Sequence, residues 1–131
     1  MREILFRGKK TGFNEWIEGY ISSPCKNTMY FMVEASTKND WCVDAETVGQ
    51  YTGLTDDKTG KKIFEGDIVA VYVKGCRTIC TVSWAETVAH FQLWQVNTVP
   101  GTPTALNLGN YDCEVLGNIY DNPELLKGGA E

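Results

Sequence analysis

The sequence predicts a mainly β (α+β) protein, in which a small N-terminal unit of a β-hairpin and a short helix precedes a small SH3-like β-barrel. Three observations predict this class. Apolar and polar residues alternate in several short runs, which is the period of a half-buried strand. Turn-forming residues, including many of the thirteen glycines, separate these runs. Only two short stretches carry the signals that begin and end a helix.

The N-terminal unit begins with two alternating runs, residues 4–7 and 16–22, which predict a hairpin joined by a turn over residues 8–15. Residues 29–35 predict a third strand. Asp44 offers a side-chain oxygen at the start of a short helix over residues 45–51. The polar segment at residues 55–62 predicts a loop at a hairpin tip, so we place the domains at residues 1–58 and 59–131.

The second domain opens with residues 68–73, which are apolar on both faces and predict a strand that is covered on both sides or wraps around a small barrel. Further strands are predicted at residues 78–84, 90–97 and 113–120. Residues 98–110 hold two prolines and two glycines and predict a long loop. Asn122 and Pro123 predict a short terminal helix, with Asn122 as its cap.

The charge of the chain bears on its partners. The net charge is -5, and residues 56–131 carry six Lys or Arg against ten Asp or Glu. Because an acidic surface repels phosphate groups, nucleic acid is an unfavourable general partner. The sequence also lacks an apolar run long enough to cross a membrane, so we expect no membrane association.

The cysteines indicate the compartment. Five are present, at positions 25, 42, 76, 80 and 113. Their odd number and irregular spacing do not match the disulfide framework of a secreted domain. The opening residues also lack the pattern of a signal peptide. We therefore expect reduced thiols and a cytoplasmic location.

Three segments of the sequence resemble the YopX-like protein family. The first is TVGQYTGL at residues 47–54, followed by Asp57 and by GKKIFEGDIV at residues 60–69. The second is Arg7 and Gly8 with WIEGY at residues 16–20, and the third is VLGNIYDNPELL at residues 115–126. The resemblance implies a prophage, plasmid or conjugative-element origin and an SH3-type barrel in the C-terminal half. The family has no assigned activity, so no functional residue is carried over.

The distinctive positions of these segments are predicted to be structural. In particular, Asp67 before an apolar strand can accept backbone N–H bonds and fix a tight turn, with Gly66 permitting the bend. The predicted structural positions are Gly49, Tyr51, Gly53, Gly60, Gly66, Asp67, Gly117, Asn122 and Pro123.

The search for catalytic or metal-binding residues gives none. Asp56, Asp57, Glu65 and Asp67 would form a cation site only if the fold brought them together, and they lack the spacing of an EF-hand. On one strand Cys76 and Cys80 would lie about 13 Å apart, too far to share a metal ion.

The single histidine, His90, has no recognisable acid–base partner in the sequence. We therefore expect no cofactor, and an enzyme is the less favoured class.

The aromatic residues give the best functional lead. Trp84, Trp94 and Tyr72 lie on predicted strands of the barrel, where they would form an exposed interaction surface; burial in the core is the alternative. Trp84 and Trp94 lie on adjacent predicted strands and so could be neighbours.

The leading hypothesis is therefore a non-enzymatic interaction module of a mobile element, which binds a protein partner through these aromatics or through a free strand edge and also self-associates. One alternative is nucleic-acid binding, with Lys61, Lys62, Lys74 and Arg77 on one side and Tyr72 or Trp84 stacking on bases. A second alternative is a small-molecule or metal-dependent enzyme that uses the Asp-rich loop.

Overall fold

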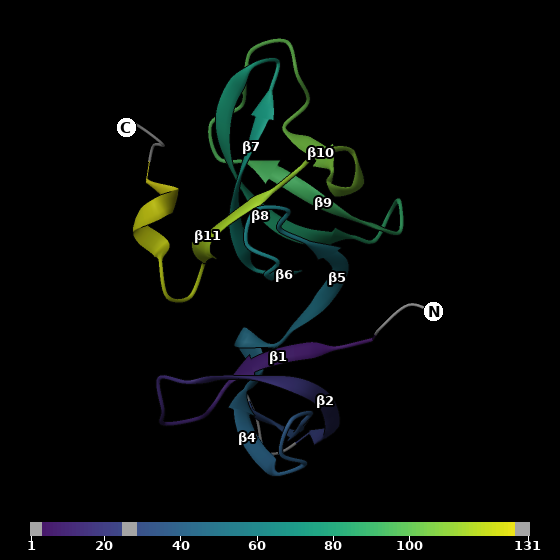
Figure 1. Cartoon of the computed structure of the whole chain (residues 1–131), viewed down its shortest axis with the longest axis vertical. Helices are drawn as coiled ribbons and strands as arrows, with labels where there is room; N and C mark the ends of the chain where they lie inside the picture. Colours follow the sequence, from purple (N-terminus) through teal and green to yellow (C-terminus); the bar gives the residue numbers. More distant parts are fainter. Residues whose placement is uncertain (1–3, 25–28, 128–131) are drawn as a thin grey trace. The chain divides into compact units, whose positions relative to one another are not determined.

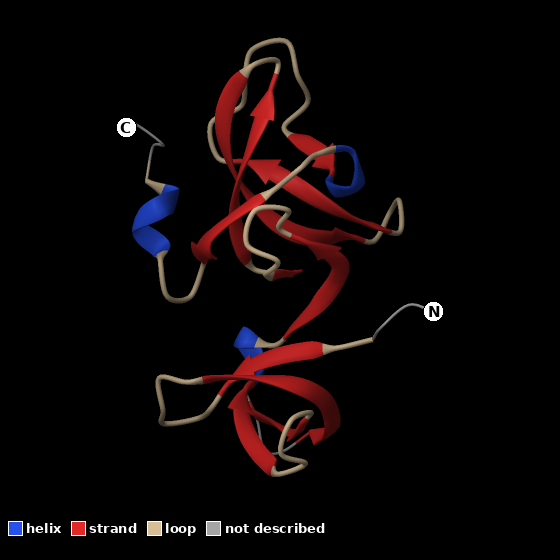
Figure 2. Ribbon diagram, viewed as in Figure 1, coloured by secondary structure: helices blue, strands red, loops and turns tan. Residues whose placement is uncertain are grey.

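The computed structural model describes residues 4–24 and 29–127, and most of these residues lie in antiparallel strands (Figures 1 and 2). The predicted mainly β class is confirmed. The chain divides into two compact units, residues 1–53 and 54–131. The predicted domains, residues 1–58 and 59–131, stay a prediction, because compactness does not show that either part folds by itself.

The first unit is a curved antiparallel sheet with the strand order β4-β3-β2-β1-β5. Its strands are β1 (Phe6–Lys9), β2 (Trp16–Pro24), β3 (Met29–Glu34), β4 (Asp40–Asp44) and β5 (Gly49–Thr55). Ile17, Met32 and Val43 form its buried core. The turn that follows β1 contacts β4, where Thr11 N donates a hydrogen bond to Cys42 O at 2.9 Å. Both predicted hairpin strands are present.

The second unit contains a five-stranded antiparallel sheet with the order β10-β9-β8-β7-β11. Its strands are β7 (Asp67–Val73), β8 (Cys76–Ala85), β9 (His90–Gln95), β10 (Ala105–Asn107) and β11 (Glu114–Asn118). The strand β6 (Lys62–Phe64) pairs instead with β5, whose last residues lie in this unit.

One face of the five-stranded sheet covers the core of the second unit. Val69 and Cys80 are opposite one another on this face, as are Val82 and Leu93. All four are buried, because alternate residues of each strand point to the same side. The edge strands of this sheet, β10 and β11, do not pair with each other. The sheet is therefore open, and the predicted SH3-like barrel is not confirmed.

The predicted helix over residues 45–51 is wrong. A single 3-10 turn, η1 (Ala45–Thr47), is followed at once by β5. The Thr47 hydroxyl donates to Asp44 O at 2.6 Å and accepts from Lys9 N at 2.9 Å, so it joins the turn to β1. Pairing with β1 thus outweighs the weak helix preference of this segment, and Asp44 makes no capping bond.

Two further predictions need correction. Residues 98–110, predicted as loop, contain β10 and the 3-10 turn η2 (Leu108–Asn110). The terminal helix is the short 3-10 turn η3 (Pro123–Leu126), and Asn122 does not cap it. The Asn122 side chain instead accepts a hydrogen bond from Asn118 N at 3.2 Å.

Candidate functional site

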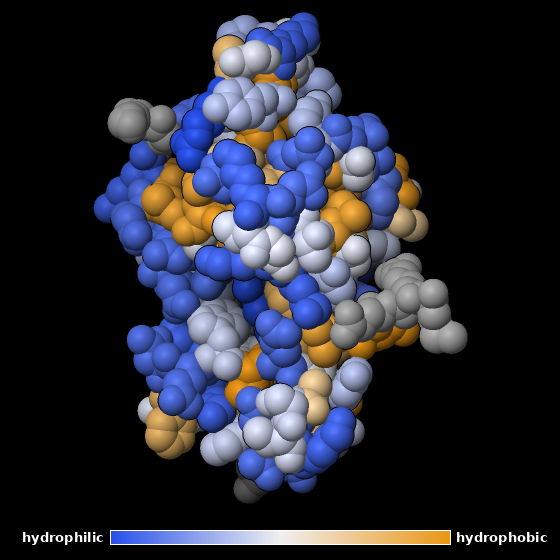
Figure 3. Space-filling view, viewed as in Figure 1, coloured by the Kyte–Doolittle hydropathy of each residue, from blue (hydrophilic) through white to orange (hydrophobic). Residues whose placement is uncertain are grey.

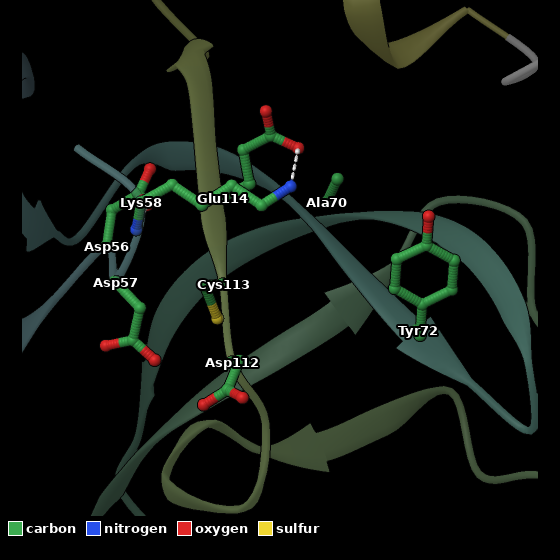
Figure 4. A pocket seen from close by; sticks show the side chains of 8 residues that line it. All are labelled: Asp56, Asp57, Lys58, Ala70, Tyr72, Asp112, Cys113 and Glu114. Carbon is green, nitrogen blue, oxygen red and sulfur yellow. Dashed lines mark hydrogen bonds and ion pairs between the residues drawn. The ribbon is translucent and has the colours of Figure 1, made fainter.

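A hollow of about 190 Å³ lies in the second unit, where the β5–β6 loop meets the start of β11 and the outer face of β7 (Figure 4). Three of its lining residues come from the loop, two from β7 and three from the segment that enters β11. These residues are Asp56, Asp57, Lys58, Ala70, Tyr72, Asp112, Cys113 and Glu114.

The loop side of the hollow is fixed by Asp56. Asp56 N donates to Lys61 O at 2.8 Å, which closes the predicted hairpin tip. The side chain is only 1% exposed, and its Oδ1 accepts from Lys58 N at 2.7 Å and Thr59 N at 3.2 Å. Its Oδ2 accepts from Val115 N at 2.9 Å. Asp56 therefore ties the loop to β11 across 59 residues of sequence.

These bonds also set the charge of Asp56. Burial by itself raises the pKa of the carboxyl, but the backbone N–H groups of Val115, Lys58 and Thr59 stabilise the carboxylate. The pKa of Asp56 is consequently below its ordinary value. The carboxylate is thus an internal hydrogen-bond acceptor of the fold and is not available to a ligand or metal ion.

The rim of the hollow carries further carboxylates. Asp57 and Asp112 are exposed, and neither forms an ion pair with any other residue that the structure describes. In contrast, Glu114 Oε1 lies 3.9 Å from both Lys58 Nζ and Arg77 Nη2. In Figure 4 the Asp57 and Asp112 carboxylates lie on the side of the hollow away from the Lys58–Glu114 pair. This side of the hollow is therefore the electronegative one.

Tyr72 forms the wall on the β7 side. Its side chain is 66% exposed, and it lies directly opposite Arg77 of β8. Ala70 precedes it on the same face and is buried. The hollow thus combines an exposed aromatic ring with unpaired carboxylates, which is the chemistry that attracts an ammonium or guanidinium group.

Cys113 also lines the hollow (Figure 4), but its side chain is buried and belongs to the core of the second unit, which also contains Cys80. Burial raises the pKa of Cys113 to about 12, and the charges of Cys80, Asp112, Asp56 and Asp57 add to this rise. A thiol with so high a pKa is protonated at neutral pH and is a poor nucleophile. The hollow therefore lacks an activated cysteine.

The three predicted surface aromatics do not form one surface. Trp84 lies opposite Phe91 on the core side of the sheet, and the two rings make an edge-to-face contact at 4.9 Å. Trp94 lies opposite Thr81 on the outer side. Trp84 and Trp94 are 41% and 50% exposed. Because they lie on opposite faces of the sheet, they are not neighbours, contrary to the expectation. The space-filling view shows apolar groups scattered among hydrophilic residues on the face it presents (Figure 3).

The four acidic residues considered for a cation site fall into two places. Asp56 and Asp57 lie in the β5–β6 loop, whereas Glu65 and Asp67 lie at the β6–β7 turn and do not line the hollow. Asp67 Oδ2 accepts from Phe64 N at 2.8 Å, which is the predicted structural use. Within residues 4–24 and 29–127, no group of three or more His, Cys, Asp or Glu side chains is arranged to hold a metal ion.

The cysteines and histidine are also separate. Cys76 lies exposed at the β7–β8 turn, whereas Cys80 is buried and burial raises its pKa to about 11. His90 bonds through Nδ1 to Phe91 O at 2.9 Å. Cys25 lies outside the described residues.

Several predicted structural positions have an identifiable use. Gly53, Gly60 and Gly66 have φ values of 90°, 76° and 89°, in the left-handed region that favours glycine. A Cβ on Gly117 would collide with the Asn122 side chain. Gly49 and Tyr51 are buried in β5, and Pro123 opens η3.

Sequence reasoning missed Asp112 and Glu114. They are more than fifty positions from Asp57, and no local motif surrounds them. Only the pairing of β11 with β7 brings them to the loop. Sequence reasoning also missed Gln95, which is 2% exposed and whose amide holds the following loop. The sequence did contain a signal for this residue, because Gln95 lies on the same face of its strand as the apolar residues Phe91 and Leu93.

The two aromatic residues considered for nucleic-acid stacking, Tyr72 and Trp84, are likewise separated. Tyr72 and Trp84 lie on opposite faces of the sheet, so a single nucleic-acid strand cannot stack on both. Arg77 already lies near Glu114. Nucleic-acid binding remains an untested prediction.

The family model of the YopX protein matches residues 5–127. The chain belongs to the YopX family. The match spans both units, so the expected resemblance is confirmed along nearly the whole chain, including the β5–β6 loop and β11 that form the hollow. A search of curated proteins finds no match. In the part of this YopX family member that the structure describes, helices are too short to cross a bilayer.

Proposed function

We propose that this YopX family member is a non-enzymatic protein-interaction module, and that the hollow beside Tyr72 receives a basic side chain of the partner. The observation that supports the proposal is that one hollow is lined both by the exposed Tyr72 ring and by Asp57 and Asp112, whose carboxylates form no ion pair with another described residue. A lysine or arginine side chain would place its aliphatic part against Ala70 and its charge between ring and carboxylates.

The chemistry of the hollow favours binding over catalysis. Asp56 is occupied by three backbone donors, and Cys113 is a protonated thiol at neutral pH. Neither group is poised to donate or accept a proton from a bound molecule. Binding of a charged side chain, in contrast, needs only the groups that face the hollow.

The setting of this function also remains a proposal. We infer a mobile-element origin from the resemblance of the sequence motifs, and a cytoplasmic location from the free thiols of Cys76, Cys80 and Cys113. The SH3-like barrel that the same motifs imply also remains a proposal, and interaction at the hollow does not depend on a closed barrel.

A first experiment uses a minimal cationic probe. We would titrate the full-length, isotope-labelled protein with Nα-acetylarginine methylamide and follow the backbone amide resonances. We expect concentration-dependent shifts at Asp57, Tyr72 and Cys113, weakened by added salt because an exposed charge is screened. Nα-acetylglutamate methylamide should leave these resonances unchanged.

Matched variants locate the effect. Tyr72→Leu keeps an apolar side chain but removes the ring, and we expect about fivefold weaker binding of the arginine probe. Asp57→Asn with Asp112→Asn should weaken it further. Trp84→Leu, on the other face, is the control. Equal shifts with both probes, or no effect of Tyr72→Leu, would show that the hollow does not select cations.

A second experiment seeks the partner itself. Wild-type protein and Tyr72→Leu would be immobilised side by side and exposed to extract of the native host. A specific partner should be recovered in stoichiometric amount by the wild type and lost with Tyr72→Leu. Failure to recover any such protein under several salt conditions would count against the interaction module.

A further inference from the structure

The edge strand β10 presents unpaired backbone groups. It is last in the sheet order and pairs only with β9. Gln95 N donates to Thr104 O at 2.9 Å, and the next pairs are Ala105 with Trp94, Leu106 with Leu93 and Asn107 with Gln92. Bonded and non-bonded pairs alternate in an antiparallel ladder, so the N–H and C=O groups of Ala105 and the N–H of Asn107 point to the free side. The C=O of Asn107 begins the 3-10 turn η2.

This edge is held in place by the buried amide of Gln95. Its Oε1 accepts from Val99 N at 2.9 Å, and its Nε2 donates to Thr102 Oγ1 at 3.0 Å and Pro103 O at 2.8 Å. The loop that leads into β10 is thereby fixed at three points. A preformed edge loses little conformational entropy when a second strand is added.

A second hollow, of about 420 Å³, lies along β10. All three residues of β10 line it, together with Val73, Tyr111 and the loop before the strand. Lys74 is the one charged residue of its lining, and Lys74 forms no ion pair with any other described residue. The hollow therefore offers space, apolar surface and a single positive charge beside a free strand edge.

We propose that an extended segment of a partner protein adds to β10 as a further strand, and that an acidic side chain of this segment pairs with Lys74. Strand addition supplies affinity through main-chain hydrogen bonds and specificity through side-chain contacts. Edge strands are often protected by charged side chains, and Ala105, Leu106 and Asn107 carry none.

The charge of Lys74 favours a partner segment over a second copy that pairs β10 with β10. A second copy that paired β10 with β10 would bring only uncharged residues to this edge and no carboxylate. A partner segment that contains Asp or Glu can form an ion pair with Lys74. This surface shares no lining residue with the hollow beside Tyr72, so the two proposals succeed or fail independently.

The test uses a displayed library of random eight-residue peptides, selected on the full-length protein. We expect the selected peptides to alternate apolar and polar residues and to carry an acidic residue at a fixed position. The best peptide would then be synthesised, with a second version in which that Glu or Asp is replaced by Gln or Asn. The amide version should bind wild type more weakly and bind Lys74→Gln as well as the acidic version does.

Two variants of Ala105 isolate the backbone edge. Ala105→Pro removes the outward N–H without breaking a bond to β9, since proline is tolerated where an edge N–H faces solvent. We expect at least about tenfold weaker peptide binding for Ala105→Pro, from the lost bond and the steric block. Ala105→Ser keeps the N–H and should bind normally. Amide exchange gives a second readout: bound peptide should protect the N–H groups of Ala105 and Asn107.

Three results would overturn the proposal. The first is a selection that returns no peptide above background, and the second is a peptide that binds Ala105→Pro as well as wild type. The third is a dimer, seen by sedimentation, that Ala105→Pro dissociates; a second copy would then be the occupant. A cooperative unfolding transition in both Ala105 variants establishes that each is folded.

Discussion

At the residue scale, Asp56 fixes the loop side of the hollow through its backbone hydrogen bonds. Its carboxylate accepts three backbone N–H bonds, two within its own loop and one from Val115 of β11. Backbone groups buried without partners are costly, so the carboxylate replaces the partners that no strand supplies here. Because its carboxylate is occupied by these donors, Asp56 cannot bind a ligand. Asp57 and Asp112 are the carboxylates of the hollow that remain exposed and without an ion pair among the described residues.

We predict that Asp56→Ala destabilises the protein by about 3 kcal/mol, because three donors lose a charged acceptor at once. Asp56→Asn should cost about 1–2 kcal/mol, since one amide oxygen remains but the NH₂ group cannot accept from Val115. Urea unfolding measures both. Asp57→Asn is the matched control and should change stability little; a comparable loss in that variant would contradict the assignment.

A pH dependence follows from the lowered pKa of Asp56. A carboxyl whose pKa is lower in the folded state stabilises the fold above the unfolded pKa, and this stability is lost as the pH falls through the folded pKa. The stability difference between wild type and Asp56→Asn should therefore be constant at neutral pH and shrink below about pH 4. A difference that grew on acidification would show the opposite shift.

At the element scale, the end of β11 is shaped by close contact between Gly117 and Asn122. Gly117 lies at a register shift in the pairing of β11 with β7. The Asn122 side chain fills the space where a Cβ of Gly117 would be, and accepts from Asn118 N. Asn118 Oδ1 in turn accepts from Tyr120 N at 3.0 Å and Asp121 N at 2.9 Å. The turn is thus built from side-chain bonds to backbone, and its glycine is needed for space.

We predict that Gly117→Ala costs about 2 kcal/mol of stability, because the added methyl group displaces Asn122. Asn122→Ala should cost about 1 kcal/mol for the lost hydrogen bond. The double variant should cost less than the sum, since removing the Asn122 side chain makes room for the methyl group. Strictly additive losses would mean that the two side chains do not compete for the same space.

At the scale of the whole molecule, the two units have separate cores. The core of the first unit is formed around Ile17, Met32 and Val43, and the core of the second includes Cys80 and Cys113. The thiols of Cys80 and Cys113 therefore report on the opening of the second unit, because a buried thiol reacts only after exposure. The cysteines allow unfolding to be followed at specific residues without any substitution.

We predict that Cys76 reacts with a thiol reagent at once, whereas Cys80 and Cys113 react only on unfolding and share one urea midpoint. Their raised pKa values, about 11 and about 12, lower the thiolate fraction in addition to burial. Peptide mapping by mass spectrometry after labelling at increasing urea measures each site. Labelling of Cys80 well before Cys113 would show that the second unit does not open as one body.

The sequence by itself determined the mainly β class, the order and approximate bounds of most strands, the hairpin tip at the β5–β6 loop and the family. These features follow from local alternation and from turn residues, which act within a few positions of the chain. The tight turn at Gly66 and Asp67 was predicted for the same reason.

The tertiary structure decided what lies together. Residues 45–51 form a strand instead of a helix because β1 offers a partner, and the second sheet stays open because β10 and β11 do not meet. Trp84 and Trp94 are separated by the β8–β9 register, which a strand pattern does not contain. The hollow joins Asp57, Tyr72 and Asp112 through long-range pairing of β7 with β11, and such pairing depends on packing over the whole unit.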